Sequence, residues 1–263
     1  MFGVACSTLP PATQEEVATT TTTWKLTVAG DSISIGLGAA LRNHTPAGVD
    51  VKVIGEEGTG LARPDVFDWP VRLAELARDF PPAILVLSLS SNDAQDLTDP
   101  DGSVVVPFTD TSTWEATYRR RLEAAVAPFE STGTTVVWVG HLRLPGEPAG
   151  SVNRRVHDLA TEVAAERPWV VVADLAELLG VGDSDVVVGG VEDSDVVVGA
   201  AEDGAAEDGA AGACLREDGV HLTGTCLSRA AEVLASRLPG WRGVSPQAAR
   251  PGSQTGMDDV AGS

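Results

Sequence analysis

Short runs of apolar residues alternate with amphipathic stretches along the chain from Trp24 to about Leu179. The runs are nearly continuous, which is typical of parallel strands that are buried on both faces of a sheet. Between them apolar residues recur at helical spacing, as Leu73, Leu76 and Ala77 do. The pattern predicts strands at 25–29, 51–54, 83–89, 134–140 and 169–173, and helices at 35–42, 66–78, 113–129, 152–166 and 226–238. The expected fold class is α/β, a three-layer α/β/α sandwich with a mainly parallel five-stranded sheet.

Three segments lack this pattern. Residues 1–23 contain a run of five threonines but no period, and residues 241–263 are rich in Pro, Gly, Ser and Gln. We expect a disordered leader or tether at 1–23, one folded domain at 24–240 and a disordered tail at 241–263.

Within the domain, residues 180–213 form an acidic low-complexity insertion, in which Val181–Gly190 is almost repeated as Val191–Ala200. The repeated Asp-Ser-Asp is suggestive of calcium ligands, but its spacing matches no calcium loop. We therefore favour a surface insertion over a metal site.

The formal net charge of −20 limits the partners that the chain can have. Nucleic acids and anionic lipid headgroups are bound through clustered Lys and Arg side chains, so we expect neither kind of partner. No apolar run approaches the roughly 20 residues that a membrane-spanning helix needs, and we expect no integral membrane segment.

The first candidate for chemistry is the tripeptide Gly30-Asp31-Ser32. It lies between a predicted strand and a predicted helix, where ligands bind in open parallel sheets and where unpaired helical N–H groups can stabilise an anion. The tripeptide alone is a weak signal, because Gly-Asp-Ser is common in turns. A second copy at Gly182–Ser184 has no strand before it, and we interpret it as a decoy.

A serine becomes a good nucleophile only when a neighbouring base takes its proton. His44 and His157 have the setting of solvent-facing residues, and His141, which follows the fourth strand, is a candidate substrate contact. His221 differs because Asp218 precedes it by three residues in a compact turn. Such an Asp can bond one ring nitrogen and leave the other as a base, although an ordinary Asp-Gly turn has the same sequence.

Polar groups also follow the second and third predicted strands. Asn92 lies shortly after the third strand, at the carboxyl edge of the sheet. A side-chain amide there can donate to a developing oxyanion. The glycines at 55, 58 and 60 follow the second strand and permit close approach of backbone N–H groups to a ligand. Because the carboxyl ends of parallel strands meet at one edge, these groups are expected to converge on one crevice.

Taken in order, Gly30-Asp31-Ser32, a glycine after the second strand, Asn92-Asp93 and Asp218-x-x-His221 resemble the blocks of the SGNH (GDSL-type) hydrolases. The stretches 59–69 and 92–96 look like a bacterial branch of that superfamily. The resemblance implies the flavodoxin-like SGNH hydrolase fold, with neither a metal nor an organic cofactor.

Carried over by motif, the resemblance makes Ser32 the nucleophile, His221 the general base and Asp218 its orienter. The oxyanion hole would combine the Ser32 N–H, the Gly58 N–H and the Asn92 side chain. Gly58 fits the family glycine by its spacing from Gly55, with Gly60 as the alternative, whereas Asp31 and Asp93 would brace the turns.

One position departs from the family pattern, which reads Gly-x-Asn-Asp where this chain has Ser90-Ser91-Asn92-Asp93. If the backbone at position 90 needs a positive φ, serine would be strained there. We therefore expect a locally adjusted turn and weaker catalysis.

The cysteines suggest a disulfide and an exported protein. Cys214 and Cys226 bracket Asp218 and His221, so a disulfide would pin the catalytic turn and stabilise the fold by roughly 3 kcal/mol. The context of Cys6 faintly resembles a bacterial lipoprotein processing site, but the apolar stretch before it is too short for a signal peptide. We expect export or association with the cell envelope, with a cytoplasmic location as the alternative.

The function that this reasoning favours is hydrolysis of carboxylic esters through an acyl-serine intermediate, on a small-molecule or carbohydrate-linked ester. An O-acyltransferase or a deacetylase of cell-envelope carbohydrate would use the same residues. A third hypothesis is a non-catalytic carbohydrate-binding protein that keeps the fold. The sequence does not disclose the oligomeric state.

Overall fold

The computed structural model describes residues 24–142, 148–180, 214–216, 218 and 220–238. Its main sheet has five strands in the order β2-β1-β3-β6-β7, and every neighbouring pair is parallel. The strands are β1 Trp24–Gly30, β2 Val49–Gly55, β3 Ile84–Ser88, β6 Thr135–Gly140 and β7 Val170–Asp174. The predicted leader, acidic insertion and tail lie outside the described residues, apart from Gly180.

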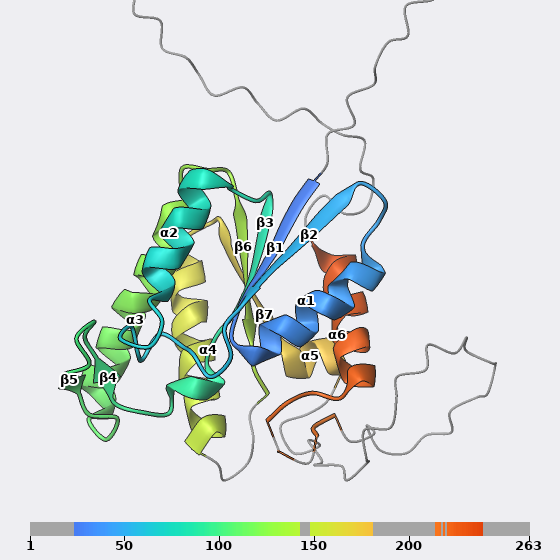
Figure 1. Ribbon diagram of the computed structural model, residues 1–263. Helices are drawn as coiled ribbons and strands as arrows, with labels where there is room; N and C mark the ends of the chain where they lie inside the picture. The colour runs from blue at the N-terminus through green and yellow to red at the C-terminus, as the bar shows by residue number, and fades with distance from the viewer. Residues whose placement is uncertain (1–23, 143–147, 181–213, 217, 219, 239–263) are drawn as a thin grey trace, which may run out of the picture.

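Helices cover both faces of the sheet, which confirms the predicted three-layer sandwich (Figure 1). α1, α5 and α6 lie on one face, and α2, α3 and α4 lie on the other. The helices are α1 Ser32–His44, α2 Trp69–Asp79, α3 Thr111–Val126, α4 Pro148–Glu166, α5 Leu175–Leu179 and α6 Gly224–Arg237, with short 3-10 turns η1 Ser91–Asp93 and η2 Ala127–Phe129.

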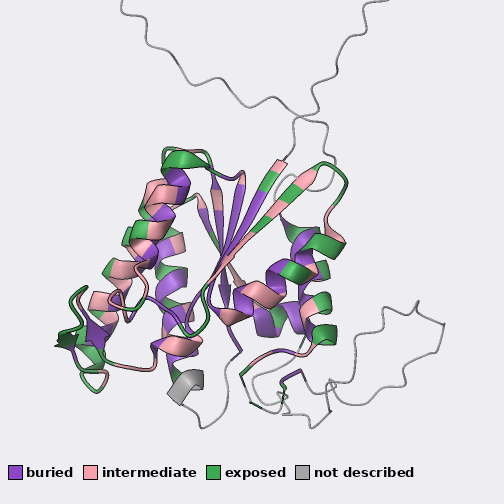
Figure 2. Ribbon diagram, in the orientation of Figure 1, coloured by how far each residue is buried: buried purple, intermediate pink, exposed green. Residues whose placement is uncertain are grey.

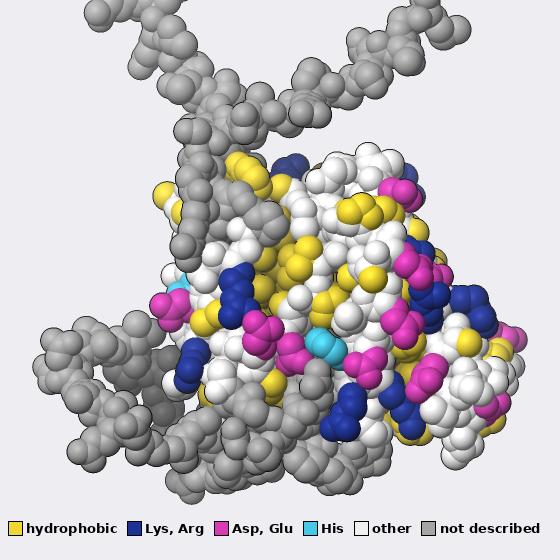
Figure 3. Space-filling model, turned by 180° about the vertical axis from the view of Figure 1, so that it is seen from behind, with side chains coloured by type: hydrophobic (Ala, Val, Ile, Leu, Met, Phe, Trp, Pro, Cys, Tyr) yellow, Lys and Arg dark blue, Asp and Glu magenta, His cyan; other side chains and the backbone are white. Residues whose placement is uncertain are grey.

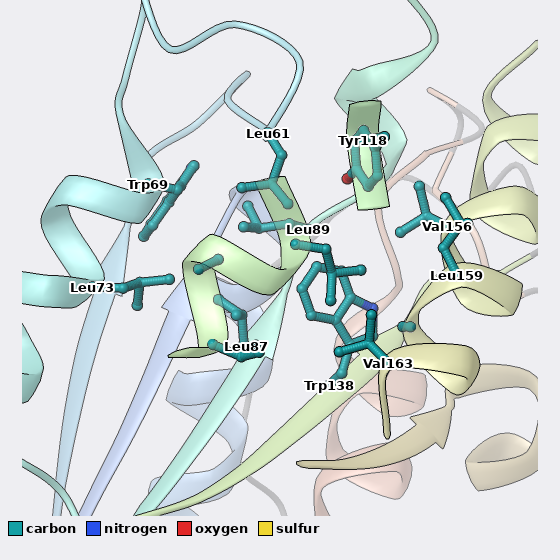
Figure 4. Close-up of a cluster of buried hydrophobic side chains, with 14 of the residues drawn as sticks. Leu61, Trp69, Leu73, Leu87, Leu89, Tyr118, Trp138, Val156, Leu159 and Val163 are labelled. Atoms are coloured by element: carbon teal, nitrogen blue, oxygen red, sulfur yellow. The ribbon is translucent and has the colours of Figure 1, made fainter. Parts of the chain in front are cut away.

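The core consists of two apolar clusters, one on each side of the sheet. β3 is buried along its whole length, and the helices turn their buried residues toward the strands (Figure 2). In the cluster beneath α2, α3 and α4, Trp138 from the sheet lies beside Val163 from α4, and Leu87 lies in the same cluster (Figure 4). Each fully buried large apolar side chain stabilises the fold by about 1.5–3 kcal/mol.

The strand order places a crevice at the carboxyl edge of the sheet. β1 pairs with β2 on one side and β3 on the other, so the chain connections diverge there. Ligands bind at such switch points in open α/β sheets. Ser32 directly follows β1, and Asn92 follows β3, so both side chains come to this edge.

Local chemistry explains where the structure differs from the expected elements. α1 begins at Ser32 rather than 35, because the Asp31 carboxylate accepts the Ile33 N–H and caps the helix. α2 begins at Trp69 rather than 66, because Asp68 caps it through the Val71 N–H. A two-stranded antiparallel unit, β4 Leu97–Thr98 and β5 Val104–Val106, was not predicted.

Charged groups on one face of the domain are mixed in sign. On the face seen in Figure 3, Asp and Glu side chains lie among Lys and Arg side chains, with small apolar groups between them.

Among the described helices, none combines the length and apolar character required to cross a bilayer. The described part of the chain also has no group of three or more His, Cys, Asp or Glu side chains arranged to hold a metal ion.

Candidate active site

The turn that carries Ser32 is built by a close approach of β1 to β3. Gly30 has a φ of +138°, and a Cβ there would lie 1.8 Å from the Ser88 carbonyl oxygen, so only glycine fits. The Asp31 N–H donates to that same oxygen at 3.1 Å. Ser32 therefore becomes the first residue of α1, held at the edge of the sheet.

Ser32, His221 and Asp218 form one hydrogen-bonded row. His221 Nε2 lies 2.8 Å from Ser32 Oγ, and His221 Nδ1 lies 2.8 Å from Asp218 Oδ2. The other oxygen of Asp218 accepts the N–H groups of Val220 and His221 at 2.9 Å each. Partial burial opposes ionisation of Asp218, but these hydrogen bonds outweigh it and lower the pKa of that carboxyl to about 2. The carboxylate is thus negatively charged next to the ring.

The turn around His221 is held by a small hairpin and a disulfide. The Arg216 N–H donates to the His221 carbonyl at 2.8 Å, and the Thr223 N–H donates to the Cys214 carbonyl at 2.9 Å. The Cys214–Cys226 disulfide then joins the start of this hairpin to the first turn of α6. The sequence expectation of a disulfide that brackets His221 matches the structure.

Asn92 lies in η1 and faces the turn that carries Ser32. Its side-chain amide donates to the Thr59 carbonyl at 3.0 Å and to Asp31 Oδ2 at 3.4 Å. Ser90, before η1, has a φ of −179°, which is extended backbone that any residue adopts. The condition for strain at Ser90, a positive φ, is therefore not met. The Ser90 hydroxyl is buried without a hydrogen-bond partner in the described structure.

The two candidate glycines occupy different settings. Gly58 has a φ of +70° and lines the pocket beside Ser32. Gly60 packs against Asp93 instead, and a Cβ there would lie 2.1 Å from Asp93 Oδ1. Of the two, Gly58 is the glycine that shares a pocket with Ser32.

The buried carboxylates of Asp31 and Asp93 hold the surrounding loops. Burial raises the pKa of Asp31 to about 7 and the pKa of Asp93 to about 6. Asp93 accepts hydrogen bonds from the N–H groups of Leu61 and Ala62 and from the Tyr118 hydroxyl. Both carboxylates brace backbone turns, and Asp93 thereby fixes the loop that follows β2.

A pocket of about 640 Å³ opens beside the Ser32 side chain. Its polar lining includes Ser32, Asn92 and His221, and its apolar lining includes Ile35, Leu222 and Leu227. Such a pocket, with a few convergent polar groups in an apolar wall, is typical of a small-molecule site.

The other three histidines lie away from this pocket. His141 is 3% exposed and contacts Ser88 and Ser91, so the expectation that it contacts substrate is wrong. His44 Nε2 lies 3.0 Å from Ser228 Oγ, and His157 Nδ1 lies 3.6 Å from Asp174 Oδ2. The contacts of His141 gave no signal in the sequence, because Ser88 and Ser91 are 53 and 50 residues away from it.

A protein-family model described as "Protein of unknown function (DUF459)" matches residues 25–187. The matched range includes Ser32 and Asn92 and ends before Asp218. A search of curated protein sequences returned no match.

Solved structures share the fold at low sequence identity. One is a protein from Slackia heliotrinireducens described as a candidate SGNH hydrolase, with a TM-score of 0.51, 15% identity, and coverage of 81% of this chain and 98% of that one. Another is a member of the lipolytic G-D-S-L family from Veillonella parvula, with a TM-score of 0.50, 16% identity, and coverage of 82% and 100%. The M. smegmatis aryl esterase has a TM-score of 0.50, 12% identity, and coverage of 81% and 97%. These similarities establish the SGNH hydrolase fold.

Proposed function

Because the chain belongs to the DUF459 family and has the SGNH hydrolase fold, we propose that it is a serine hydrolase that cleaves carboxylic esters through an acyl-Ser32 intermediate. The observation that carries the proposal is the row Ser32 Oγ, His221 Nε2, His221 Nδ1 and Asp218 Oδ2, joined by two 2.8 Å contacts. A nucleophile, a base and a group that orients the base are the parts that acyl transfer requires.

In the first half-reaction, Ser32 Oγ attacks the ester carbonyl while His221 Nε2 takes the hydroxyl proton. The Asp218 carboxylate accepts the Nδ1–H, which leaves Nε2 as the base and stabilises the imidazolium that forms. His221 then gives the proton to the departing alcohol. A water molecule repeats the sequence on the acyl-serine and releases the carboxylic acid.

The oxyanion would be stabilised by the N–H groups of Ser32 and Gly58 and by the Asn92 amide. One Asn92 amide hydrogen bonds the Thr59 carbonyl at 3.0 Å, whereas the contact to Asp31 is longer, at 3.4 Å. We assign the hydrogen with the weaker contact to the oxyanion, since catalytic hydrogen bonds often tighten only when substrate is bound. The apolar wall of the pocket would hold the apolar part of the ester.

We propose that the folded domain comprises residues 24–240. We also propose that the protein is located outside the cytoplasm. The support for this location is the Cys214–Cys226 disulfide, because disulfides form and persist in oxidising compartments.

The test is hydrolysis of p-nitrophenyl esters of graded acyl length by the wild type and by Ser32→Ala. We expect turnover by the wild type and a loss of about three or more orders of magnitude in the variant. Ser184→Ala, in the second Gly-Asp-Ser, is the matched control and should retain full activity. Activity that survives in Ser32→Ala would overturn the proposal, and acyl transfer to an added saccharide in preference to water would identify the acyltransferase alternative.

A further inference from the structure

A buried histidine contacts two serines of the segment that leads from β3 to the candidate oxyanion donor, Asn92. His141 follows β6, and its Nε2 lies 2.7 Å from Ser88 Oγ while its Nδ1 lies 2.6 Å from Ser91 Oγ. Ser88 ends β3 and accepts the Asp31 N–H through its carbonyl. Ser91 is the neighbour of Asn92 in η1. The imidazole ring thus joins the end of β3, whose carbonyl accepts the Asp31 N–H, to the turn that carries Asn92.

The hydrogen bonds around the ring can all be satisfied in one tautomer. Nε2 faces two oxygens, Ser88 Oγ at 2.7 Å and Asp31 Oδ1 at 3.8 Å, which favours a hydrogen on this nitrogen. Nδ1 then accepts the Ser91 hydroxyl hydrogen. Ser91 Oγ remains free to accept from Asn153 Nδ2 at 3.3 Å, and that amide also donates to the Leu142 carbonyl at 2.8 Å.

The neutral ring is the form that suits these partners. Burial lowers the pKa of His141 to about 3, so the ring carries no charge at neutral pH. Neither nitrogen is available as a base, because each is occupied by a serine and the side chain does not line the pocket beside Ser32. What the residue can do is hold the serines at a fixed separation.

We propose that His141 is a positioning residue for the oxyanion hole. Through its contact with Ser91, His141 holds Asn92 against the Ser32 turn. This inference rests on the proposed esterase function. A displacement of the order of 1 Å in a catalytic group costs about 100-fold in rate, so a side chain that never touches substrate can control turnover in this way. The network reaches α4 through Asn153, whose amide donates to Ser91 Oγ and ties the same turn to the helix layer.

The test compares His141→Phe, His141→Gln, Ser91→Ala and the double variant His141→Phe/Ser91→Ala with the wild type on p-nitrophenyl acetate. Active sites are counted by fluorophosphonate titration, so that kcat refers to folded enzyme. We expect kcat of His141→Phe to fall about 10- to 100-fold with KM within about twofold. Glutamine offers an NH2 group as donor and a carbonyl oxygen as acceptor, and His141→Gln should recover much of the loss.

The double variant separates positioning through Ser91 from a general structural role. If His141 acts through Ser91, the double variant should lose no more activity than the worse single variant. His44→Gln, at a histidine that contacts Ser228 on the outside of the domain, should keep the wild-type kcat.

Unchanged kcat per active site in both His141→Phe and Ser91→Ala would overturn the inference, as would multiplicative losses in the double variant. If His141→Phe fails to fold, Ser91→Ala carries the test alone, and a wild-type kcat in that variant contradicts the inference. These outcomes differ from failure of the proposed function, in which the wild type itself has no ester turnover and no labelled Ser32.

Discussion

His221 Nε2 lies 2.8 Å from Ser32 Oγ, although 189 residues separate the two in the sequence. Ser32 is fixed at the start of α1, and His221 precedes α6, so the distance depends on how these two helices pack. A Cβ at Gly36 would lie 2.8 Å from Leu227 Cδ1, which shows how closely α6 approaches α1 at this glycine. The contact between Ser32 and His221 thus depends on helix packing as well as on the turn itself.

Asp218→Asn should reduce kcat by about 100- to 10,000-fold while the fold stays intact. The asparagine can still accept the Val220 and His221 N–H groups through its oxygen, but its amide NH2 would then face His221 Nδ1. That arrangement places the ring hydrogen on Nε2, which no longer accepts the Ser32 proton. Steady-state kinetics on p-nitrophenyl acetate measures the loss. Asp50→Asn, at an exposed carboxylate on β2, removes the same charge and should have no effect.

Asn92→Ala should lower kcat by about 100- to 1,000-fold and change KM little, because an oxyanion donor acts mainly in the transition state. Asn43→Ala, at an exposed residue near the end of α1, is the matched control. A drop in kcat/KM that came only from a higher KM would assign Asn92 to substrate binding instead.

Replacement of both Cys214 and Cys226 by serine should destabilise the domain by about 3 kcal/mol, because the disulfide closes a loop with a sequence separation of 12. Urea unfolding measures the difference. Dithiothreitol should shift the wild-type curve by the same amount and leave the double variant unaffected. Equal curves for the wild type with and without reductant would contradict the expectation.

Asp31→Asn should flatten the pH dependence of stability. Burial raises the pKa of Asp31 from 3.8 to about 7, so the folded state binds a proton that the unfolded state has released. Stability therefore falls as the pH rises through this window, and Asp93 acts in the same direction up to about pH 6. The thermal midpoint of the wild type should decrease from pH 4 to pH 7, and Asp31→Asn should decrease less. Identical slopes would show that Asp31 does not titrate as inferred.

The sheet and its flanking helices could be predicted from the sequence because the central strands β3 and β6 are nearly continuous apolar runs. β3, predicted at 83–89 and observed at Ile84–Ser88, is an example. The unit of β4 and β5 was missed because strands of two and three residues leave no usable period.

The candidate site could be predicted as far as motif order allowed. Ser32, Asn92 and His221 each lie within a recognisable sequence block, and the structure brings these three residues to one pocket. The bridge from His141 to Ser88 and Ser91 could not be predicted, because it depends on which residues of β3 and β6 lie side by side at the edge of the sheet.

Covalent labelling with a fluorophosphonate tests the central claim most directly. The probe reacts with a serine only when a neighbouring base activates it. Peptide mapping by mass spectrometry should find one adduct, on Ser32, and His221→Ala should abolish it without unfolding the protein. An adduct on Ser184 or on another serine, or no adduct on the folded wild type, would contradict the assignment of Ser32 as an activated nucleophile.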